Sequence, residues 1–135
     1  MFVQHLFADE WLDQIDQGRG INDPSWADAQ QAILSLNAIT KSIVTLADRE
    51  WSDYFMLIAG SWDGRVVVNA TRDNLNFFSL IDPAGSREMR SLSIIGENEQ
   101  HEERKCVPVS WAIEAAQHFF ETGELKSTLS WVRDA

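Results

Sequence analysis

The sequence predicts an α+β fold, in which an antiparallel β-meander of about five to six strands carries two main helices packed on the sheet. Turn signals support the meander, because Asp63-Gly64 and Asp82-Pro83-Ala84-Gly85 each separate runs rich in β-branched and aromatic residues. Pro24 marks the start of one helix and Gly123 the end of another. Since these helical segments flank the strand-rich middle of the chain, both are expected to pack on one sheet.

The N-terminal segment is expected to contain a strand and a short helix. Residues 1–7 alternate well enough to indicate a strand. The segment from Asp9 to Gln17 fits a short helix, which Gly18-Arg19-Gly20 then breaks. The apolar side of this helix would comprise Trp11, Leu12 and Ile15.

A longer helix is predicted to start after Asn22. Asp23 is placed to cap it, and Pro24 fits its first helical position. Apolar residues at helical spacing then form one buried stripe, which comprises Trp26, Ala29, Ile33 and Leu36. This helix is expected to end near Leu36 to Ala38.

The middle of the chain has the period-two pattern of strands. Asp-Gly is the strongest short hairpin signal, because both residues tolerate the positive φ angles of a tight turn. Asp63-Gly64 therefore joins two strands, and the turns at residues 72–74 and 82–85 extend the meander. The strands predicted in this way are Ser42–Leu46, Tyr54–Ser61, Arg65–Thr71, Leu75–Ile81 and Met89–Ile95.

The C-terminal third is predicted to contain a polar loop, a strand and a helix. Gly96 to Lys105 is rich in glutamate and is expected to be exposed, and Cys106–Val109 follows as a short strand. Ser110 is placed to cap a helix that Gly123 ends. The buried stripe of this helix is expected to comprise Ile113, Ala116, Phe119 and Phe120, with Trp131 packing near the end of the chain.

Length and charge restrict the class of protein. The 135 residues suit one domain, residues 1–135, with a substantial core. The 21 acidic and 11 basic residues leave a net charge of −10, which repels nucleic-acid phosphates and favours basic protein partners. Cys106 is the single cysteine and suits a reducing compartment. Since the N-terminus lacks a basic leader and no run approaches about 20 apolar residues, we expect a cytoplasmic protein without membrane contact.

Residue types that carry out catalysis are not grouped in this sequence. The histidines show no metal-ligand spacing, and they are His5, His101 and His118. Cys106 is expected to be a buried, unreactive thiol. Gly60 to Gly64 precedes a strand, whereas a phosphate-binding loop precedes a helix. We therefore expect no catalytic residue, no metal and no cofactor.

Acidic side chains are predicted to form the surface that contacts a partner. An acidic protein that blocks the basic substrate channel of a nucleic-acid-targeting toxin gains rapid, complementary association. Glutamates after residue 95 and aspartates on hairpin turns suit this role, and a tryptophan beside Arg65 suits an anchor. The candidate partner-binding residues are Trp62, Asp63, Asp73, Glu97, Glu99, Glu102 and Glu103. Alternatively, Trp62 covers the sheet edge.

Several segments match, in order, the signature of one bacterial family. They are Pro24-Ser25-Trp26, Met56–Ser61, Gly64–Val68, Val107-Pro108-Val109, Ala112, Ala115-Ala116, Phe119-Phe120, Thr122-Gly123 and Leu129-Ser130-Trp131. On these residues, over about 22–132, the chain resembles immunity protein family 1 of polymorphic-toxin systems, although Ile95-Gly96-Glu97-Asn98 departs from the double glycine of many relatives. The resemblance implies an antitoxin that binds a cognate secreted toxin, such as a nucleic-acid deaminase or nuclease, without catalysis.

Two other functions fit the sequence. One is a small adaptor or oligomeric interaction protein whose exposed aromatic residues pair with another chain, although a monomer is favoured. The other is a carboxylate-based enzyme, which requires a concave pocket holding an acid of raised pKa. The gene directly upstream would distinguish these functions, because a toxin domain encoded there would identify the partner.

Overall fold

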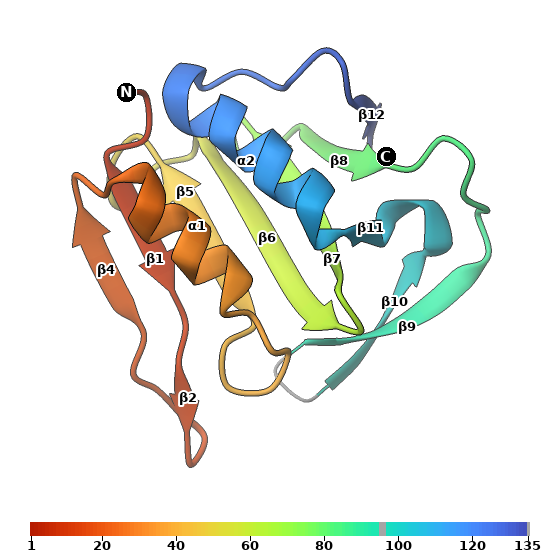
Figure 1. Cartoon of the computed structure of the whole chain (residues 1–135), viewed down its shortest axis with the longest axis horizontal. Helices are drawn as coiled ribbons and strands as arrows, with labels where there is room; N and C mark the ends of the chain where they lie inside the picture. The colour runs from red at the N-terminus through yellow and green to blue at the C-terminus, as the bar shows by residue number, and fades with distance from the viewer. Residues whose placement is uncertain (95–96, 135) are drawn as a thin grey trace.

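The computed structural model describes residues 1–94 and 97–134, apart from the side chains of Trp62 and Ser93 (Figure 1). A large antiparallel sheet forms the centre of this α+β structure, and both helices of the described chain lie on the same face of it. The predicted fold class and the packing of the helices on the sheet are therefore confirmed.

The main sheet has eight strands, more than the predicted five to six. Its order is β12 (Ser130–Arg133), β8 (Phe77–Ile81), β7 (Arg65–Thr71), β6 (Phe55–Trp62), β5 (Ile43–Ala47), β1 (His5–Ala8) and β4 (Arg19–Asn22), and β11 (Val107–Pro108) also pairs with β7. The strands that the prediction did not include are β4 and β12. Each has only four residues, too few for an alternating pattern to be distinctive in the sequence.

The central hairpin β6–β7 forms as predicted. Asp63 and Gly64 have φ angles of 54° and 79°, the positive values that a tight turn between antiparallel strands requires. Alternate side chains of each strand point to opposite faces of the sheet. The residues that face the helices are fully buried, and they include Met56, Ile58, Val66 and Val68. The intervening residues, such as Leu57 and Asn69, point to the helix-free face.

Residues 9–17 form a β-hairpin arm, so the helix predicted there is wrong. The strands β2 (Trp11–Leu12) and β3 (Ile15–Asp16) pair across a tight turn. Asp13 and Gln14 occupy this turn with φ angles of 51° and 69°, which suit a hairpin and not a right-handed helix. In so short a segment, the spacing of the apolar residues is compatible with either structure.

Hydrogen bonds from backbone N–H groups to two carboxylates near the base of the arm explain why this segment forms a hairpin and not a helix. Asp9 is only 4% exposed and accepts the backbone N–H of Ser42 at 2.7 Å. Asp16 accepts the backbone N–H of Gly18 at 2.8 Å. Such bonds from side chain to backbone compete with helix formation. The Gly18-Arg19-Gly20 segment consequently leads into β4, which pairs with β1, instead of breaking a helix.

Helix α1 (Trp26–Leu34) is capped by Ser25 and not by the predicted Asp23. The Ser25 hydroxyl accepts the Asp28 N–H at 3.1 Å, and the Asp28 carboxylate accepts the Ser25 N–H at 2.9 Å. This reciprocal capping box shifts the helix start, so Pro24 precedes the cap instead of taking the first helical position. The predicted stripe is buried at Ala29, Ile33 and Leu36 and half-buried at Trp26.

Helix α2 (Val109–Thr122) begins directly after β11, without the predicted cap from Ser110. The Val109 N–H donates to the Gly64 carbonyl at 3.0 Å, so the β6–β7 turn satisfies one donor at the helix start. Gly123 ends the helix as predicted, with a left-handed φ of 75°. The buried face comprises Ala112, Ala115, Ala116, Phe119 and Phe120, whereas the predicted Ile113 is half-buried.

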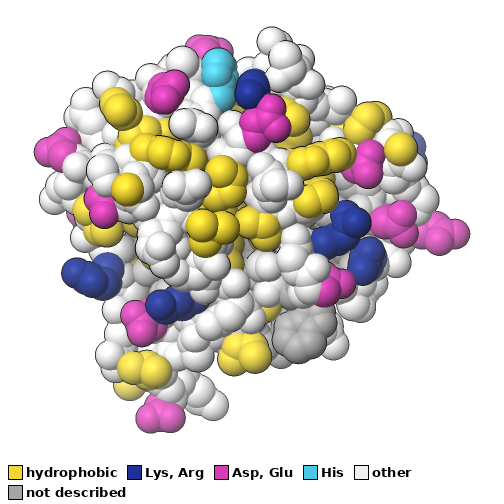
Figure 2. Space-filling model, in the orientation of Figure 1, with side chains coloured by type: hydrophobic (Ala, Val, Ile, Leu, Met, Phe, Trp, Pro, Cys, Tyr) yellow, Lys and Arg dark blue, Asp and Glu magenta, His cyan; other side chains and the backbone are white. Residues whose placement is uncertain are grey.

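The main core lies between the helices and the sheet. Its largest fully buried side chains are Phe119, Phe120, Leu6, Ile33, Leu46, Met56, Ile58 and Leu80. Trp131 packs against this core but is only half-buried, and its indole N–H donates to the Lys126 carbonyl at 3.1 Å. Figure 2 views the helix side, where most charged side chains surround an apolar centre. Within the described residues, no helix has the length and apolar character to span a membrane.

A separate two-stranded ribbon forms from β9 (Met89–Ile94) and β10 (Glu97–Glu102), followed by a 3₁₀ turn at Glu103–Lys105. Two predictions are therefore wrong: β9 is not a strand of the main meander, and the polar segment after it is not a loop. The residues of β10 are exposed or half-buried, so no apolar alternation indicated a strand. Ile95 and Gly96, predicted as the end of a strand and the start of a loop, lie outside the described residues.

The ribbon packs on the helix-free face of the main sheet. Leu92 and Ile94 of β9 form a second buried cluster with Ala59 and Val67 of the central hairpin. Cys106 belongs to the same cluster and is 1% exposed. The ribbon thus covers the end of this face that lies nearest the Asp63-Gly64 turn, and it leaves an open groove over β1, β5 and the start of β6.

Candidate partner-binding surface

Three of the glutamates predicted to contact a partner lie in β10, namely Glu97, Glu99 and Glu102. Glu97 and Glu99 are exposed and stand directly opposite Ile94 and Leu92 of β9. Directly opposed residues of an antiparallel pair share one face. Since Leu92 and Ile94 are buried against the main sheet, these two exposed glutamates lie on the ribbon face that is turned toward the sheet.

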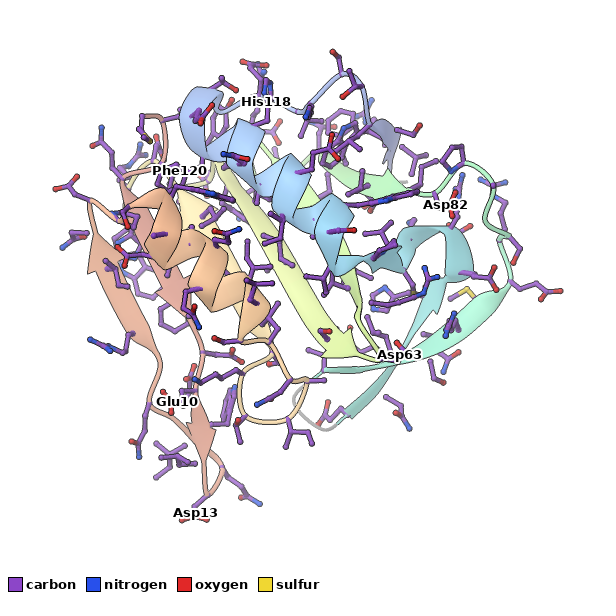
Figure 3. All side chains as sticks on the ribbon, viewed as in Figure 1. Glu10, Asp13, Asp63, Asp82, His118 and Phe120 are labelled. Atoms are coloured by element: carbon purple, nitrogen blue, oxygen red, sulfur yellow. The ribbon has the colours of Figure 1, made fainter. Side chains whose placement is uncertain are left out.

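Asp63 lies next to the ribbon through its ion pair with Arg90. Its carboxylate lies 3.3 Å from the Arg90 guanidinium, and Arg90 stands opposite His101 in the ribbon. The Nε2 atom of His101 lies 3.2 Å from the Glu99 carboxylate. Figure 3 shows Asp63 at the end of the central hairpin, beside the ribbon. We call the surface formed by Asp63, Glu97 and Glu99 the acidic edge.

Glu102 is held among basic side chains. Its carboxylate lies 3.4 Å from Arg87, 3.3 Å from Arg104 and 3.6 Å from Lys105. Burial acts to raise the pKa of Glu102, but the hydrogen bond from Arg104 and the three positive charges together lower it. Glu102 therefore ties the ribbon to the segment that follows it, while the neighbouring Glu103 is exposed.

Asp73 lies in the turn after β7, at the opposite end of this strand from Asp63. Its carboxylate accepts the backbone N–H of Asn76 at 2.8 Å, the side-chain amide of Asn76 at 2.7 Å and the backbone N–H of Leu75 at 2.9 Å. These bonds, led by that from the Asn76 backbone, lower the pKa of Asp73. Asp73 therefore orders its own turn and lies apart from the acidic edge.

The structure brings most of the predicted residues to one region. Those on or beside the ribbon are Asp63, Glu97, Glu99, Glu102 and Glu103. Asp73 is separate from them. The backbone of Trp62 pairs with Arg65 at the end of the central hairpin, but the Trp62 side chain lies outside the described residues.

A second surface, which the sequence did not predict, is the uncovered part of the helix-free sheet face. The strand register aligns its side chains in two rows. One row comprises Phe7, Thr45, Leu57, Asn69 and Ser79, and the next comprises His5, Ala47, Phe55, Thr71 and Phe77. Neither row contains an aspartate, glutamate, lysine or arginine. The rows themselves therefore carry no charged side chain, although Asp134 accepts the Ser79 hydroxyl at 2.8 Å at the β8 end of the face.

The residues that β1, β5 and β6 contribute to these rows line an open groove of about 610 Å³, which Arg49 and Glu50 also line. Phe7, Phe55 and Leu57 are half-buried in the groove, and Trp51 is 92% exposed at its border. The rings of Phe55 and Phe77 meet edge to face, with their centroids 6.3 Å apart. Single exposed apolar residues are ordinary, but a contiguous apolar groove is typical of a binding surface. This groove and the acidic edge both lie on the helix-free side of the molecule.

Possible metal ligands, one thiol and two carboxylates show what chemistry the described residues offer. Among them, no group of three or more His, Cys, Asp or Glu side chains is arranged to hold a metal ion. Cys106 is buried as predicted, and burial raises the pKa of its thiol, which disfavours the reactive thiolate. The pKa values of Asp73 and Glu102 are both lowered, the opposite of what a proton donor requires.

The chain matches no model of a known protein family, and no curated protein matches it.

Proposed function

We propose that the chain is an immunity protein, an antitoxin that binds a cognate secreted bacterial toxin and occludes its active site. The observation that carries this proposal is the acidic edge of Asp63, Glu97 and Glu99 on the same side as a largely apolar groove. An apolar contact area with a polar border is the usual composition of a protein–protein interface. The net charge of −10 and the resemblance to immunity protein family 1 support the same function.

A toxin that acts on nucleic acids, such as a deaminase or a nuclease, fits this surface best. The substrate channel of such an enzyme binds phosphates and is therefore rich in lysine and arginine. The acidic edge attracts a basic channel and accelerates the encounter, and the groove adds apolar contacts once the complex has formed. The same negative charge repels nucleic acid, so the proposed partner is the toxin alone.

The proposed mechanism is occlusion, which needs no cofactor, metal or catalytic residue of the immunity protein. We place the complex in the cytoplasm, where the reducing environment suits a single buried thiol at Cys106. One copy of the chain is proposed to bind one toxin.

The groove also favours a second candidate, an adaptor or oligomeric interaction protein. Trp51 is 92% exposed beside Phe55, and an apolar surface of this kind can pair two chains. The net charge of −10 opposes self-association through mutual repulsion. A carboxylate-based enzyme is a weaker candidate, because the lowered pKa values of Asp73 and Glu102 oppose proton donation.

The test uses the protein encoded by the gene directly upstream, which this proposal expects to contain a toxin domain. The double variant Glu97→Lys, Glu99→Lys should slow association roughly tenfold and weaken its dependence on ionic strength in stopped-flow measurements. The double variant Asp53→Lys, Glu121→Lys changes the net charge equally. Asp53 precedes β6 and Glu121 lies near the end of α2, both far from the acidic edge, so this control should slow association much less.

Equal association rates for the unaltered protein and the Glu97→Lys, Glu99→Lys variant would show that the interface does not include the acidic edge. An unaltered protein that neither binds this toxin domain nor protects cells producing it would contradict the proposed function.

A further inference from the structure

The β2–β3 arm extends away from the body of the molecule (Figure 1). Figure 3 shows Asp13 at its tip. Every residue from Leu12 to Gln17 is exposed, so this segment contributes little to the core. A two-stranded hairpin is at best marginally stable by itself, and the arm therefore depends on contacts at its base.

The arm presents two aliphatic side chains on one side. Leu12 and Ile15 pair directly across the two strands, so their side chains point the same way. They are 47% and 63% exposed. An aliphatic pair on a narrow protrusion has the shape of an anchor that fills a pocket in a partner protein.

Hydrogen bonds at the base hold the arm in place. The Trp11 backbone N–H donates to the Thr40 carbonyl at 2.7 Å, and the Trp11 indole N–H donates to the buried Asp9 carboxylate at 2.9 Å. Asp9 also accepts the Ser42 backbone N–H at 2.7 Å. Because the arm is ordered before any partner arrives, binding avoids part of the entropy cost of ordering it.

The arm lies at the same end of the molecule as the acidic edge (Figure 3). At the base of the arm, Asp9 accepts a hydrogen bond from Ser42. The Ser42 carbonyl in turn accepts the Gly60 N–H at 3.0 Å, and Gly60 lies three residues before Asp63. The segment that joins α1 to β5 also exposes Ile39, by 57%. A partner covering this end would therefore meet exposed aliphatic side chains and the acidic edge together.

We infer that the arm inserts into the active-site cleft of the toxin, where Leu12 and Ile15 fill an apolar pocket. The inference rests on the proposed function and adds to it the element that occludes the cleft. Glu10 and Asp13 accompany the aliphatic pair along the arm, so the matching cleft has lysine or arginine on its walls and apolar residues at its floor. The acidic edge then contacts the rim of the same cleft.

The double variant Leu12→Ser, Ile15→Ser tests the arm. Since both side chains are exposed, the melting temperature should change little. The Kd for the toxin domain encoded directly upstream, measured by calorimetry, should rise roughly tenfold or more. Leu75→Ser is the matched control, because Leu75 is 82% exposed in the turn after β7, and its Kd should equal that of the unaltered protein.

A crosslinker at the tip gives an independent measurement. Gln14→Cys can be labelled selectively with a benzophenone maleimide, since Cys106 is 1% exposed. Illumination of the complex should attach the tip to residues lining the toxin's active site. Gln117→Cys, on the exposed side of α2, should give no crosslink there.

Unaltered affinity of a folded Leu12→Ser, Ile15→Ser variant would overturn the inference about the arm and leave the proposed function intact. Crosslinks from Gln14→Cys to toxin residues outside the cleft would also overturn the inference about the arm and leave the proposed function intact. Failure of the unaltered protein to bind the toxin domain would overturn both.

Discussion

Carboxylates in this chain divide into those that hold the fold and those that remain at the surface. Asp9 is 4% exposed and anchors the arm, and Glu102 joins the ribbon to basic side chains. Glu97 and Glu99 are exposed on the ribbon. Composition alone treats these residues alike, because each adds one negative charge. Their roles are separated by backbone donors and basic side chains that the fold brings near some of them and not others.

Asp73 makes the stability of the protein depend on pH. Hydrogen bonds from Asn76 and Leu75 lower its folded-state pKa below the ordinary value of 3.8, so the unfolded chain takes up the proton more readily. The resulting stabilisation is complete above that value and is lost as the pH falls below it. Asp73→Asn should therefore destabilise the protein more near neutral pH than near pH 3 in urea unfolding. An equal loss at both pH values would contradict this role of the carboxylate.

At the scale of elements, the sequence predicts structure well where the signal is local. Asp63-Gly64 and Gly123 specify a turn and a helix end through backbone conformations that few residues tolerate. The arm was mispredicted because Asp9 and Asp16 bond backbone N–H groups that the sequence does not place beside them. Strand β10 was missed because its pairing with β9 leaves its side chains largely in solvent.

The candidate surface was predicted only in part. The sequence predicted that acidic residues near the ribbon would share one surface with Asp63 and Asp73. Asp73 lies apart from Asp63 because the two residues are at opposite ends of β7. The groove was missed although β6 carries a signal for it. Phe55 and Leu57 are apolar at positions that alternate with the buried Met56 and Ile58, a pattern typical of a strand with contacts on both faces.

The ribbon is expected to depend on its apolar contacts with the main sheet. Leu92→Ala should lower the free energy of unfolding by about 2–4 kcal/mol, because Leu92 is 3% exposed against the central hairpin. Local opening of the ribbon should also expose Cys106, so its reaction with a thiol reagent should accelerate. Met89→Ala on the same strand is the control, since Met89 is 59% exposed. Equal labelling rates in both variants would show that Leu92 does not hold the ribbon over Cys106.

Across the whole molecule, the two sides of the sheet differ in packing. Both helices cover one side, whereas the ribbon covers only part of the other and leaves a largely apolar groove, which Arg49 and Glu50 also line. The base of the arm and Asp63 lie at the same end of the sheet, and Figure 3 shows the tip of the arm, at Asp13, apart from Asp63. A net charge of −10 adds a long-range attraction for a basic partner, which the groove and the arm can then contact closely.

The central claim is that this chain neutralises a toxin by direct binding. The most direct measurement is calorimetric titration of the purified protein against the toxin domain encoded by the gene directly upstream, combined with an assay of that toxin's activity. If the proposed function is correct, the titration gives a tight complex of one copy of each protein, and the toxin loses its activity at equimolar ratio. A toxin that remains active at saturating concentrations of this protein, or an upstream gene that encodes no toxin, would contradict it.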